Sequence, residues 1–154
     1  MLFQTYAEVE FLLAEAALRG WHSGNPAEHY SNGVRAAMEH LSMYGASATV
    51  STEAIDQYLT DHPFNEAAGM QMIGEQYWMA TFLDEYEAWA NWRRTGYPIL
   101  VPVTYPGNIT DGQIPRRMRY YENEYGNNGA SINEALDRQG PDEFTTRMWW
   151  DVAE

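Results

Sequence analysis

The sequence predicts a mainly α-helical protein, because capping signals and apolar residues at helical spacing fill residues 1–96. We expect these helices to pair into tetratricopeptide-like hairpins, although no second copy recurs at the period of about 34 residues typical of that repeat. Residues 97–154 should instead be irregular, because turn-forming residues interrupt them at Pro102, Pro106-Gly107, Asp111-Gly112 and Pro115. The expected architecture is helical hairpins followed by a long, loop-rich C-terminal half.

The first two helices are expected to form a hairpin. Thr5 begins the first helix with Glu8 three residues later, the spacing of a capping box, and Gly20 ends it. Its buried stripe is predicted to be Tyr6, Val9, Leu13, Ala16 and Ala17. The second helix begins at Asn25-Pro26 and ends at Gly45, with an apolar face of Tyr30, Val34, Ala37, Met38 and Leu41. The two helices can approach closely at small residues, which are Ala16, Ala17, Gly33 and Ala37.

A short third helix is expected from Ser51 to about Leu59, and one long fourth helix, capped by Asn65, from about Glu66 to Thr95. Aromatic residues at steps of three or four predict the buried face of the long helix: Trp78, Phe82, Tyr86, Trp89 and Trp92 or Arg93. The helix should end sharply, because its last residues are Arg93 and Arg94, followed by Gly96 and Pro98.

Little regular structure is predicted after Pro98. A fifth, short helix is expected from about Ile132 to Arg138. The loop 126–129, Gly-Asn-Asn-Gly, favours a left-handed turn ahead of that helix. The aromatic tail 148–151 is expected to pack back on the body of the protein.

Composition excludes several classes of function. The chain has 22 acidic and 9 basic residues, a formal net charge of −13, and every basic residue is arginine. This charge disfavours binding to nucleic acid and to anionic membrane surfaces. Cysteine is absent, which excludes disulfides, thiolate catalysis and cysteine-ligated metal. No apolar run approaches the ~20 residues that a membrane-spanning helix needs, and no cofactor is expected.

No catalytic or metal-binding residue can be assigned. Two sets of carboxylates could form an acid/base pair for glycoside cleavage, Asp84 with Glu85 and Glu87, and Asp142 with Glu143. In so acidic a chain they are more typical of a solvated surface. The histidines lack the spacing of a metal site; they are His22, His29, His40 and His62. We therefore expect a protein that is not an enzyme.

Aromatic residues are the candidates for binding. The chain has six tryptophans and eleven tyrosines. A sugar presents an apolar C–H face that stacks on a flat ring, and hydroxyls that pair with polar side chains. The helical aromatic stripe is more typical of a core. The tyrosines in predicted loops are the better candidates for sugar contacts: Tyr97, Tyr105, Tyr120, Tyr121 and Tyr125.

Six motifs occur in order along the chain: Thr5-Tyr6-Ala7-Glu8-Val9 with Ala14-Glu15-Ala16-Ala17-Leu18-Arg19-Gly20-Trp21; Ala27-x-x-Tyr30-x-x-Gly33-Val34 with Met38-Glu39; Ile73-x-x-Gln76-x-Trp78; Glu87-Ala88-Trp89 with Arg93-Arg94-Thr95-Gly96-Tyr97-Pro98; Pro115-Arg116-Arg117-Met118 with Tyr120, Glu124 and Asn127; and Gly140-x-Asp142 with Trp149-Trp150-Asp151. Through these motifs nearly the whole chain resembles the SusD/RagB family of nutrient-binding outer-membrane lipoproteins, and it is similar to the family's C-terminal portion.

The resemblance implies a helical, tetratricopeptide-containing protein at the cell surface, held in the outer membrane by a lipid on an N-terminal cysteine. Such a protein binds oligosaccharides, or peptides in some members, and delivers them to a SusC-like TonB-dependent transporter without cleaving them. The family is several times longer than this chain, so residues 1–154 are expected to lack its N-terminal part, together with the signal peptide and the lipidated cysteine. No binding motif of the family maps onto this sequence, so the ligand-binding residues stay unassigned.

Two other functions remain open. A helical adaptor of tetratricopeptide type would bind protein partners on a concave face. A glycoside hydrolase would use one of the carboxylate sets above and would release reducing sugar from a polysaccharide.

Overall fold

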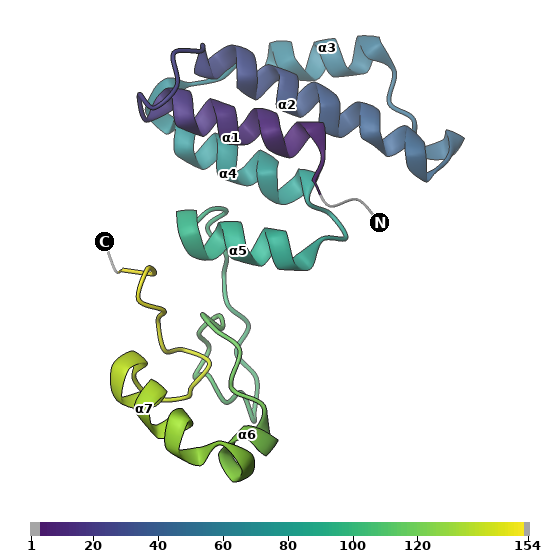
Figure 1. The fold of residues 1–154 in the computed structure, drawn as a ribbon. Helices are drawn as coiled ribbons and strands as arrows, with labels where there is room; N and C mark the ends of the chain where they lie inside the picture. Colours follow the sequence, from purple (N-terminus) through teal and green to yellow (C-terminus); the bar gives the residue numbers. More distant parts are fainter. Residues whose placement is uncertain (1–3, 153–154) are drawn as a thin grey trace. The chain divides into compact units, whose positions relative to one another are not determined.

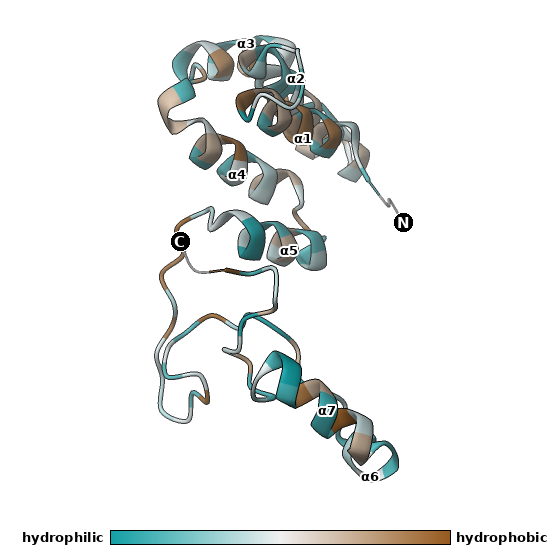
Figure 2. Cartoon of the chain, turned by 60° about the vertical axis from the view of Figure 1, so that its left-hand side comes forward, coloured by the Kyte–Doolittle hydropathy of each residue, from teal (hydrophilic) through white to brown (hydrophobic). Residues whose placement is uncertain are grey.

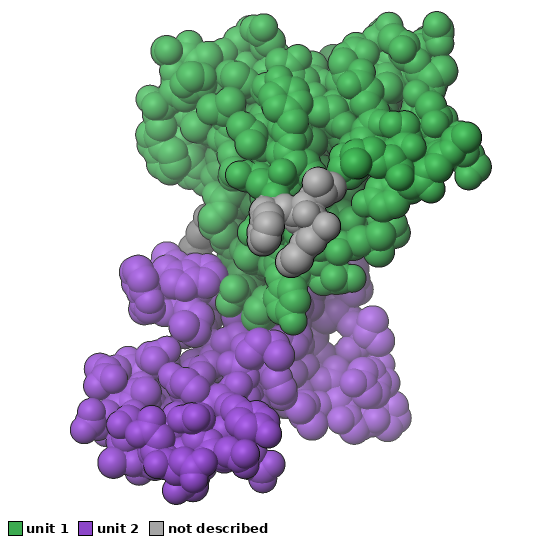
Figure 3. Space-filling model, turned by 45° about the vertical axis from the view of Figure 1, so that its right-hand side comes forward, with its two compact units in different colours: residues 1–99 green, residues 100–154 purple. Residues whose placement is uncertain are grey.

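Helices and the turns and loops between them form residues 4–152, the part of the chain that the computed structural model describes (Figure 1). This part contains no β-strand, which confirms the mainly α-helical prediction. The chain divides into two units, residues 1–99 and residues 100–154, which Figure 3 shows in different colours. Predictions that fall on residues 1–3 and 153–154 lie outside the described residues.

The predicted hairpin is formed by α1 (Tyr6–Leu18) and α2 (Pro26–His40). The capping box of α1 is present, because the Glu8 N–H donates to Thr5 Oγ1 over 3.2 Å and the Thr5 N–H donates to Glu8 Oε1 over 2.7 Å. At the start of α2, the Ala27 N–H donates to Asn25 Oδ1 over 2.9 Å. Both helix starts are therefore where the sequence predicts them.

The buried face of α1 differs from the predicted one. Ala7, Phe11 and Ala14 are buried, whereas Tyr6 and Val9 of the predicted stripe are exposed. The remaining members of that stripe, Leu13, Ala16 and Ala17, are half-buried. Figure 2 shows both apolar and hydrophilic residues along α1. Since its apolar residues do not fall on a single stripe, helical periodicity permits either face. The large ring of Phe11 decides between them, because its burial removes the most apolar surface from water.

Phe11 is the centre of the core of unit 1. Its side chain has no exposed surface, and its ring lies 6.2 Å from the ring of Tyr30 on α2 and 6.4 Å from that of Tyr77 on α4 (Gly69–Ala80). Gly33 of α2 lies directly against the ring: a Cβ at this position would be 2.7 Å from Phe11 Cε1. The close approach predicted for Gly33 is therefore confirmed, and it allows three helices to meet at one ring.

Shorter helices follow the hairpin. The 3₁₀ helices η1 (Leu41–Tyr44) and η2 (Ala46–Ala48) lead to α3 (Thr52–Asp61). The Ala54 N–H donates to Ser51 Oγ, so Ser51 caps α3, which begins where the sequence predicts.

The single long helix predicted from Glu66 to Thr95 is wrong. The segment contains η3 (Glu66–Ala68), α4, and a separate helix α5 (Glu85–Thr95). Between α4 and α5, Leu83 adopts a left-handed backbone with φ of 70°, and the Glu87 N–H donates to Asp84 Oδ1. Asp84 thus begins a new helix, where the sequence suggested only a charged residue on a continuous one.

The break changes the environment of the aromatic stripe. Phe82 and Tyr86 are 68% and 82% exposed, whereas Trp92 is buried. Trp78 and Trp89 are half-buried, so the prediction that these residues form one core face is wrong. The end of α5 is as predicted: Gly96 is left-handed, with φ of 76°, and its N–H donates to Trp92 O over 2.8 Å.

An ion pair between the partly exposed Arg94 and the buried Glu15 joins α5 to α1 across 79 residues of sequence. Arg94 donates from both Nη atoms to the two carboxylate oxygens of Glu15, over 2.6 and 2.7 Å. Arg19 donates a third hydrogen bond to Glu15, over 2.8 Å. Burial raises the pKa of Glu15, but the hydrogen bonds and charges of Arg94 and Arg19 outweigh it, so the net pKa lies below the ordinary value. Glu15 is therefore an ionised, fully paired carboxylate.

Unit 2 contains α6 (Glu122–Asn127) and α7 (Gly129–Gln139). The predicted fifth helix corresponds to α7, whereas α6 was not predicted. The left-handed turn expected within 126–129 is wrong, because no residue of that loop has a positive φ and Asn128 has a φ of −139°.

The tail of unit 2 is held by a carboxylate. Asp151 is buried and accepts hydrogen bonds from Arg147 over 2.6 Å and from Arg116 over 3.4 Å. Trp149 is 83% exposed. The prediction that this aromatic tail packs back is therefore wrong for Trp149, because the ion pairs of Asp151 fix the segment instead. In the described part of the chain, no helix has the length and apolarity needed to cross a membrane.

The close approach at Gly33 predicts the effect of one added methyl group. We expect Gly33→Ala to lower the free energy of unfolding by about 1–3 kcal/mol, because the new Cβ overlaps the Phe11 ring. Gly126→Ala is the matched control, since a Cβ there meets nothing within 4 Å and Gly126 lies within α6. Denaturant unfolding followed by circular dichroism measures both. A Gly33→Ala variant as stable as the parent contradicts this packing.

The Glu15–Arg94 pair predicts a loss of stability that depends on pH. At neutral pH we expect Arg94→Met to destabilise unit 1 by about 1–3 kcal/mol, because the buried Glu15 loses two hydrogen bonds from a cation, an effect that solvent reduces since the Arg94 side chain is 41% exposed. The folded-state pKa of Glu15 is lowered, so its stabilisation is present above the unfolded value of 4.5 and is lost as pH falls through the folded value. The difference between parent and variant should therefore shrink below about pH 4.5.

The matched control for this experiment is Arg35→Met. Arg35 pairs with the exposed carboxylate of Asp56, so its loss should cost less than about 1 kcal/mol. Equal effects of the two substitutions, or an Arg94→Met effect that does not change with pH, would refute the role given to Glu15.

Candidate functional site

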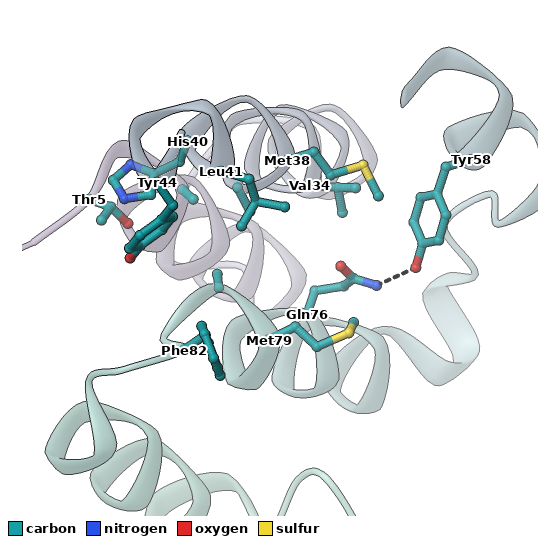
Figure 4. Close-up of a pocket in the computed structure, with 13 residues that line it drawn as sticks. Thr5, Val34, Met38, His40, Leu41, Tyr44, Tyr58, Gln76, Met79 and Phe82 are labelled. Atoms are coloured by element: carbon teal, nitrogen blue, oxygen red, sulfur yellow. Dashed lines mark hydrogen bonds between the residues drawn. The ribbon is translucent and has the colours of Figure 1, made fainter. Parts of the chain in front are cut away.

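An apolar groove lies between α1, α2, η1 and α4 in unit 1 (Figure 4). Its volume is about 220 Å³, and exposed apolar side chains line it at Tyr44, Met79 and Phe82. Figure 4 shows Tyr44 and Phe82 toward one end of the groove and Tyr58 at the other, where the Gln76 amide donates to Tyr58 Oη over 2.8 Å. Although Thr5, His40 and Gln76 are among its lining residues, most of the lining surface is apolar, which suits an apolar ligand better than a sugar.

A second hollow, of about 420 Å³, lies between α1 and α5 and is polar. Glu8, Glu87 and Arg94 line it, and Tyr77 Oη donates to Glu87 Oε2 over 3.4 Å. Burial, followed by the negative charges of Glu87 and Glu8, raises the pKa of Tyr77. The tyrosine therefore stays protonated at neutral pH and cannot act as a base.

The third hollow lies in unit 2 and has a volume of about 650 Å³. Its lining combines one tyrosine, one arginine, two carboxylates and several apolar side chains: Ile109, Arg119, Tyr125, Leu136, Pro141, Asp142, Glu143, Phe144 and Thr145. Such a mixture of an apolar surface and a few fixed polar groups is typical of small-molecule sites.

Asp142 lines this hollow and binds several of the neighbouring polar groups. Its carboxylate accepts hydrogen bonds from Tyr125 Oη over 2.6 Å and from the Tyr120 N–H over 3.1 Å. Arg117 Nη2 lies 3.0 Å from Asp142 Oδ1, and Arg119 Nε lies 3.8 Å from Oδ2. One buried carboxylate therefore sets the positions of two tyrosines and two arginines.

The charge of Asp142 is fixed by these donors. Burial raises its pKa, but the hydrogen bonds from Tyr125 and Tyr120 and the charges of Arg117 and Arg119 outweigh it, so the net pKa lies below the ordinary value. A general acid for glycoside cleavage needs the opposite shift, so that it carries a proton at neutral pH. The arrangement is that of a structural anchor.

The tyrosines predicted to contact sugar have different environments. Tyr125 lines the hollow of unit 2, and Tyr120 binds Asp142 through its backbone N–H. Tyr121 is exposed just before α6, and Tyr105 lines a neighbouring hollow of unit 2. Tyr97 packs in unit 1, where a Cβ on Gly74 would lie 2.5 Å from its Cβ. The structure thus brings the Tyr120 backbone N–H and the Tyr125 hydroxyl together at Asp142, whereas Tyr97 belongs to unit 1.

The carboxylates and histidines considered as candidates in the sequence make contacts that contribute to the fold. Asp84 caps α5, Glu85 is exposed, and Glu87 accepts from Tyr77. All four histidines contact aromatic rings or each other: His22 lies beside His29, His40 beside Tyr44, and His62 stacks on Tyr58 at 4.3 Å. His29 Nδ1 also lies 2.7 Å from Glu10 Oε2. Within residues 4–152, no group of three or more His, Cys, Asp or Glu side chains could hold a metal ion.

Sequence analysis missed Arg119 and the role of Asp142. A signal was present, because three of the nine basic residues of the chain fall within 116–119. Such a cluster in an acidic chain indicates a buried carboxylate partner, but the sequence cannot say which of 22 acidic residues supplies it.

A family model described as "Starch-binding associating with outer membrane" matches residues 1–121. A solved chitin-binding protein is 40% identical over 96% of this chain, with a TM-score of 0.90. A chitin-binding SusD homologue from Flavobacterium johnsoniae is 30% identical over 96% of the chain, with a TM-score of 0.75. A protein from Bacteroides vulgatus, described as a "putative outer membrane protein, probably involved in nutrient binding", is 28% identical over 99% of the chain, with a TM-score of 0.83.

The chain spans about a third of the length of these structures, 33%, 36% and 35% respectively. No curated protein is significantly similar to it. The family model covers most of the chain, and the solved SusD homologues share its helical fold nearly from end to end. The chain therefore belongs to the SusD-like family.

Proposed function

We propose that this protein binds a neutral glycan of the chitin class for nutrient uptake at the outer membrane, and that it does not cleave the glycan. The observation that carries the proposal is the 40% identity to a chitin-binding protein over 96% of the chain, at a TM-score of 0.90. The match to a second chitin-binding homologue supports the same ligand class.

The charge of the chain supports a neutral ligand. With a net charge of −13, the surface repels polyanionic glycans, whereas chitin carries no charge. Affinity must then come from ring stacking and hydrogen bonds, and the described residues offer both in exposed tyrosines and arginines.

Absence of cleavage is supported by the state of the carboxylates. Asp142 is paired with two arginines and accepts from two tyrosine groups, and Asp84 is a helix cap. Glycoside cleavage needs one protonated and one free carboxylate on either side of the bond. The surroundings of Asp142 and Asp84 favour binding over chemistry.

The rest of the proposal concerns the whole protein. Residues 1–154 correspond in our proposal to the C-terminal portion of a SusD-like domain, helical over 1–96 and loop-rich over 97–154. A full-length protein would be anchored by a lipid at the cell surface and would deliver its ligand to a SusC-like TonB-dependent transporter. The family description as outer-membrane-associated supports this location.

The apolar groove of Figure 4 favours a second candidate function, that of a helical adaptor. Its exposed methionine and aromatic side chains would suit an apolar peptide. Such an adaptor would bind its peptide in the absence of any glycan.

Calorimetric titration of the 154-residue chain tests the proposal. We expect binding of a chitin hexasaccharide, weaker binding of the cellulose hexasaccharide, which lacks the N-acetyl groups, and no binding of an oligogalacturonate, which is anionic. Incubation with the chitin hexasaccharide should produce no new reducing ends.

Each result bears on a different part of the proposal. Binding of an apolar peptide with no binding of either neutral hexasaccharide would overturn the glycan function and support the adaptor. Release of reducing ends that stops on substitution of one carboxylate would overturn the non-catalytic assignment. Tighter binding of the cellulose hexasaccharide would overturn the chitin class alone.

A further inference from the structure

We propose that the hollow of unit 2 around Tyr125 is a glycan subsite that holds one N-acetylated sugar unit. The inference rests on the proposed function and adds to it the residues that make contact. Stacking on Tyr125, hydrogen bonds from Arg119 and an apolar wall for the acetyl group are the three interactions involved.

The ring of Tyr125 is presented in a fixed orientation. It is 41% exposed, lines the hollow, and is tied through its hydroxyl to the buried carboxylate of Asp142 over 2.6 Å. Asp142 is itself held by Arg117 and by the Tyr120 N–H, so the carboxylate that accepts from the Tyr125 hydroxyl is fixed in position. Little side-chain entropy remains to be lost when a pyranose stacks on this ring.

Arg119 supplies the polar contact. Its side chain is more than half exposed, and its guanidinium carbon lies 6.0 Å above the ring of Phe144. Among the described residues, its ion pair to Asp142 is made through Nε at 3.8 Å. A guanidinium has five N–H donors in a rigid fork, so the Nη groups can donate to sugar hydroxyls or to the carbonyl of an N-acetyl group.

Apolar side chains complete the hollow. Ile109 is exposed, and Leu136 and Pro141 line the same space. The methyl of an N-acetyl group would lose contact with water against these side chains. A buried methyl group favours binding by about fourfold, so this wall gives a preference for N-acetylglucosamine over glucose.

The composition of this hollow distinguishes it from the groove of unit 1. A sugar needs an aromatic face and several donors and acceptors at once. The lining surface of the unit 2 hollow, with Tyr125, Arg119 and Glu143, is about as polar as it is apolar, whereas the lining surface of the groove is mainly apolar. The sugar is therefore assigned to unit 2.

The test uses the complete 154-residue chain and the chitin hexasaccharide in calorimetric titrations. We expect Tyr125→Ala to weaken binding at least tenfold, and Arg119→Gln to weaken it severalfold. Tyr121→Ala is the matched control, because Tyr121 is 72% exposed in the same unit and does not line the hollow. It should bind as the parent does.

A further variant keeps the test decisive if Tyr125→Ala does not fold properly. If thermal unfolding shows that Tyr125→Ala is destabilised, Ile109→Ala replaces it, since Ile109 is exposed and makes little contribution to packing. This variant should lose the preference for the chitin over the cellulose hexasaccharide by about fourfold.

The outcomes separate the subsite from the function. If the parent binds the chitin hexasaccharide and the Tyr125, Arg119 and Ile109 variants bind it equally well, the subsite is overturned and the proposed function stands. If the parent binds no neutral hexasaccharide, both are overturned. Weaker binding of the chitin hexasaccharide by these variants, with binding by Tyr121→Ala unchanged, supports the subsite.

Discussion

The packing of Phe11 against Gly33 is the contact on which unit 1 depends. Gly33 has no side chain, so α2 can approach the ring of Phe11 closely, and Tyr30 and Tyr77 then enclose the ring from α2 and α4. The remaining core residues, including Val34 and Ile73, surround this contact. Because the ring touches three helices at once, its position determines which face of α1 is buried. The exposed groove of Figure 4 lies beside the same helices.

In each unit a buried carboxylate bonds to groups from distant parts of the sequence. In unit 1, Glu15 joins α1 to the end of α5 through Arg94. In unit 2, Asp142 joins the loop after α7 to Arg117, Tyr120 and Tyr125. Both carboxylates lose their hydration on folding, and both recover that loss through several hydrogen bonds to charged or polar donors. The candidate sugar site of unit 2 is a consequence of this second anchor.

Signals that act within a few residues of sequence were read correctly. Thr5 with Glu8, Asn25 with Pro26, Ser51, and Gly96 begin or end helices where predicted, because capping depends on residues within one turn. Features that depend on partners distant in the sequence were not predicted correctly. Helical spacing could not select Phe11 over Tyr6 and Val9 on α1, since the Gly33 that accepts the ring lies on another helix.

The same limit applies to the break before α5 and to the candidate site. Asp84 reads equally well as a cap or as an exposed acid in a long helix, and the exposure of Phe82 and Tyr86 follows only once the helix breaks. Tyr125 is among the loop tyrosines that the sequence predicts as candidates for sugar contact. Arg119 was not, because its relation to Asp142 spans 23 residues and the two are brought together only by the fold of unit 2.

Arginine is the cation that pairs with Glu15 in unit 1 and with Asp142 in unit 2, and this choice affects how the fold responds to pH. Guanidinium groups stay charged throughout the accessible alkaline range, so these two ion pairs are not lost by titration of their cations. Alkaline sensitivity must then arise from phenols: burial raises the pKa of Tyr30 to about 12, so its contribution is complete below the unfolded value of 10.0 and disappears as pH rises through the folded one. Acid sensitivity arises from Glu15 and Asp142 at the opposite extreme. Between these limits neither Glu15 nor Asp142 changes its ionisation, so the segments that these two carboxylates tie together should keep their arrangement over a wide range of pH around neutrality.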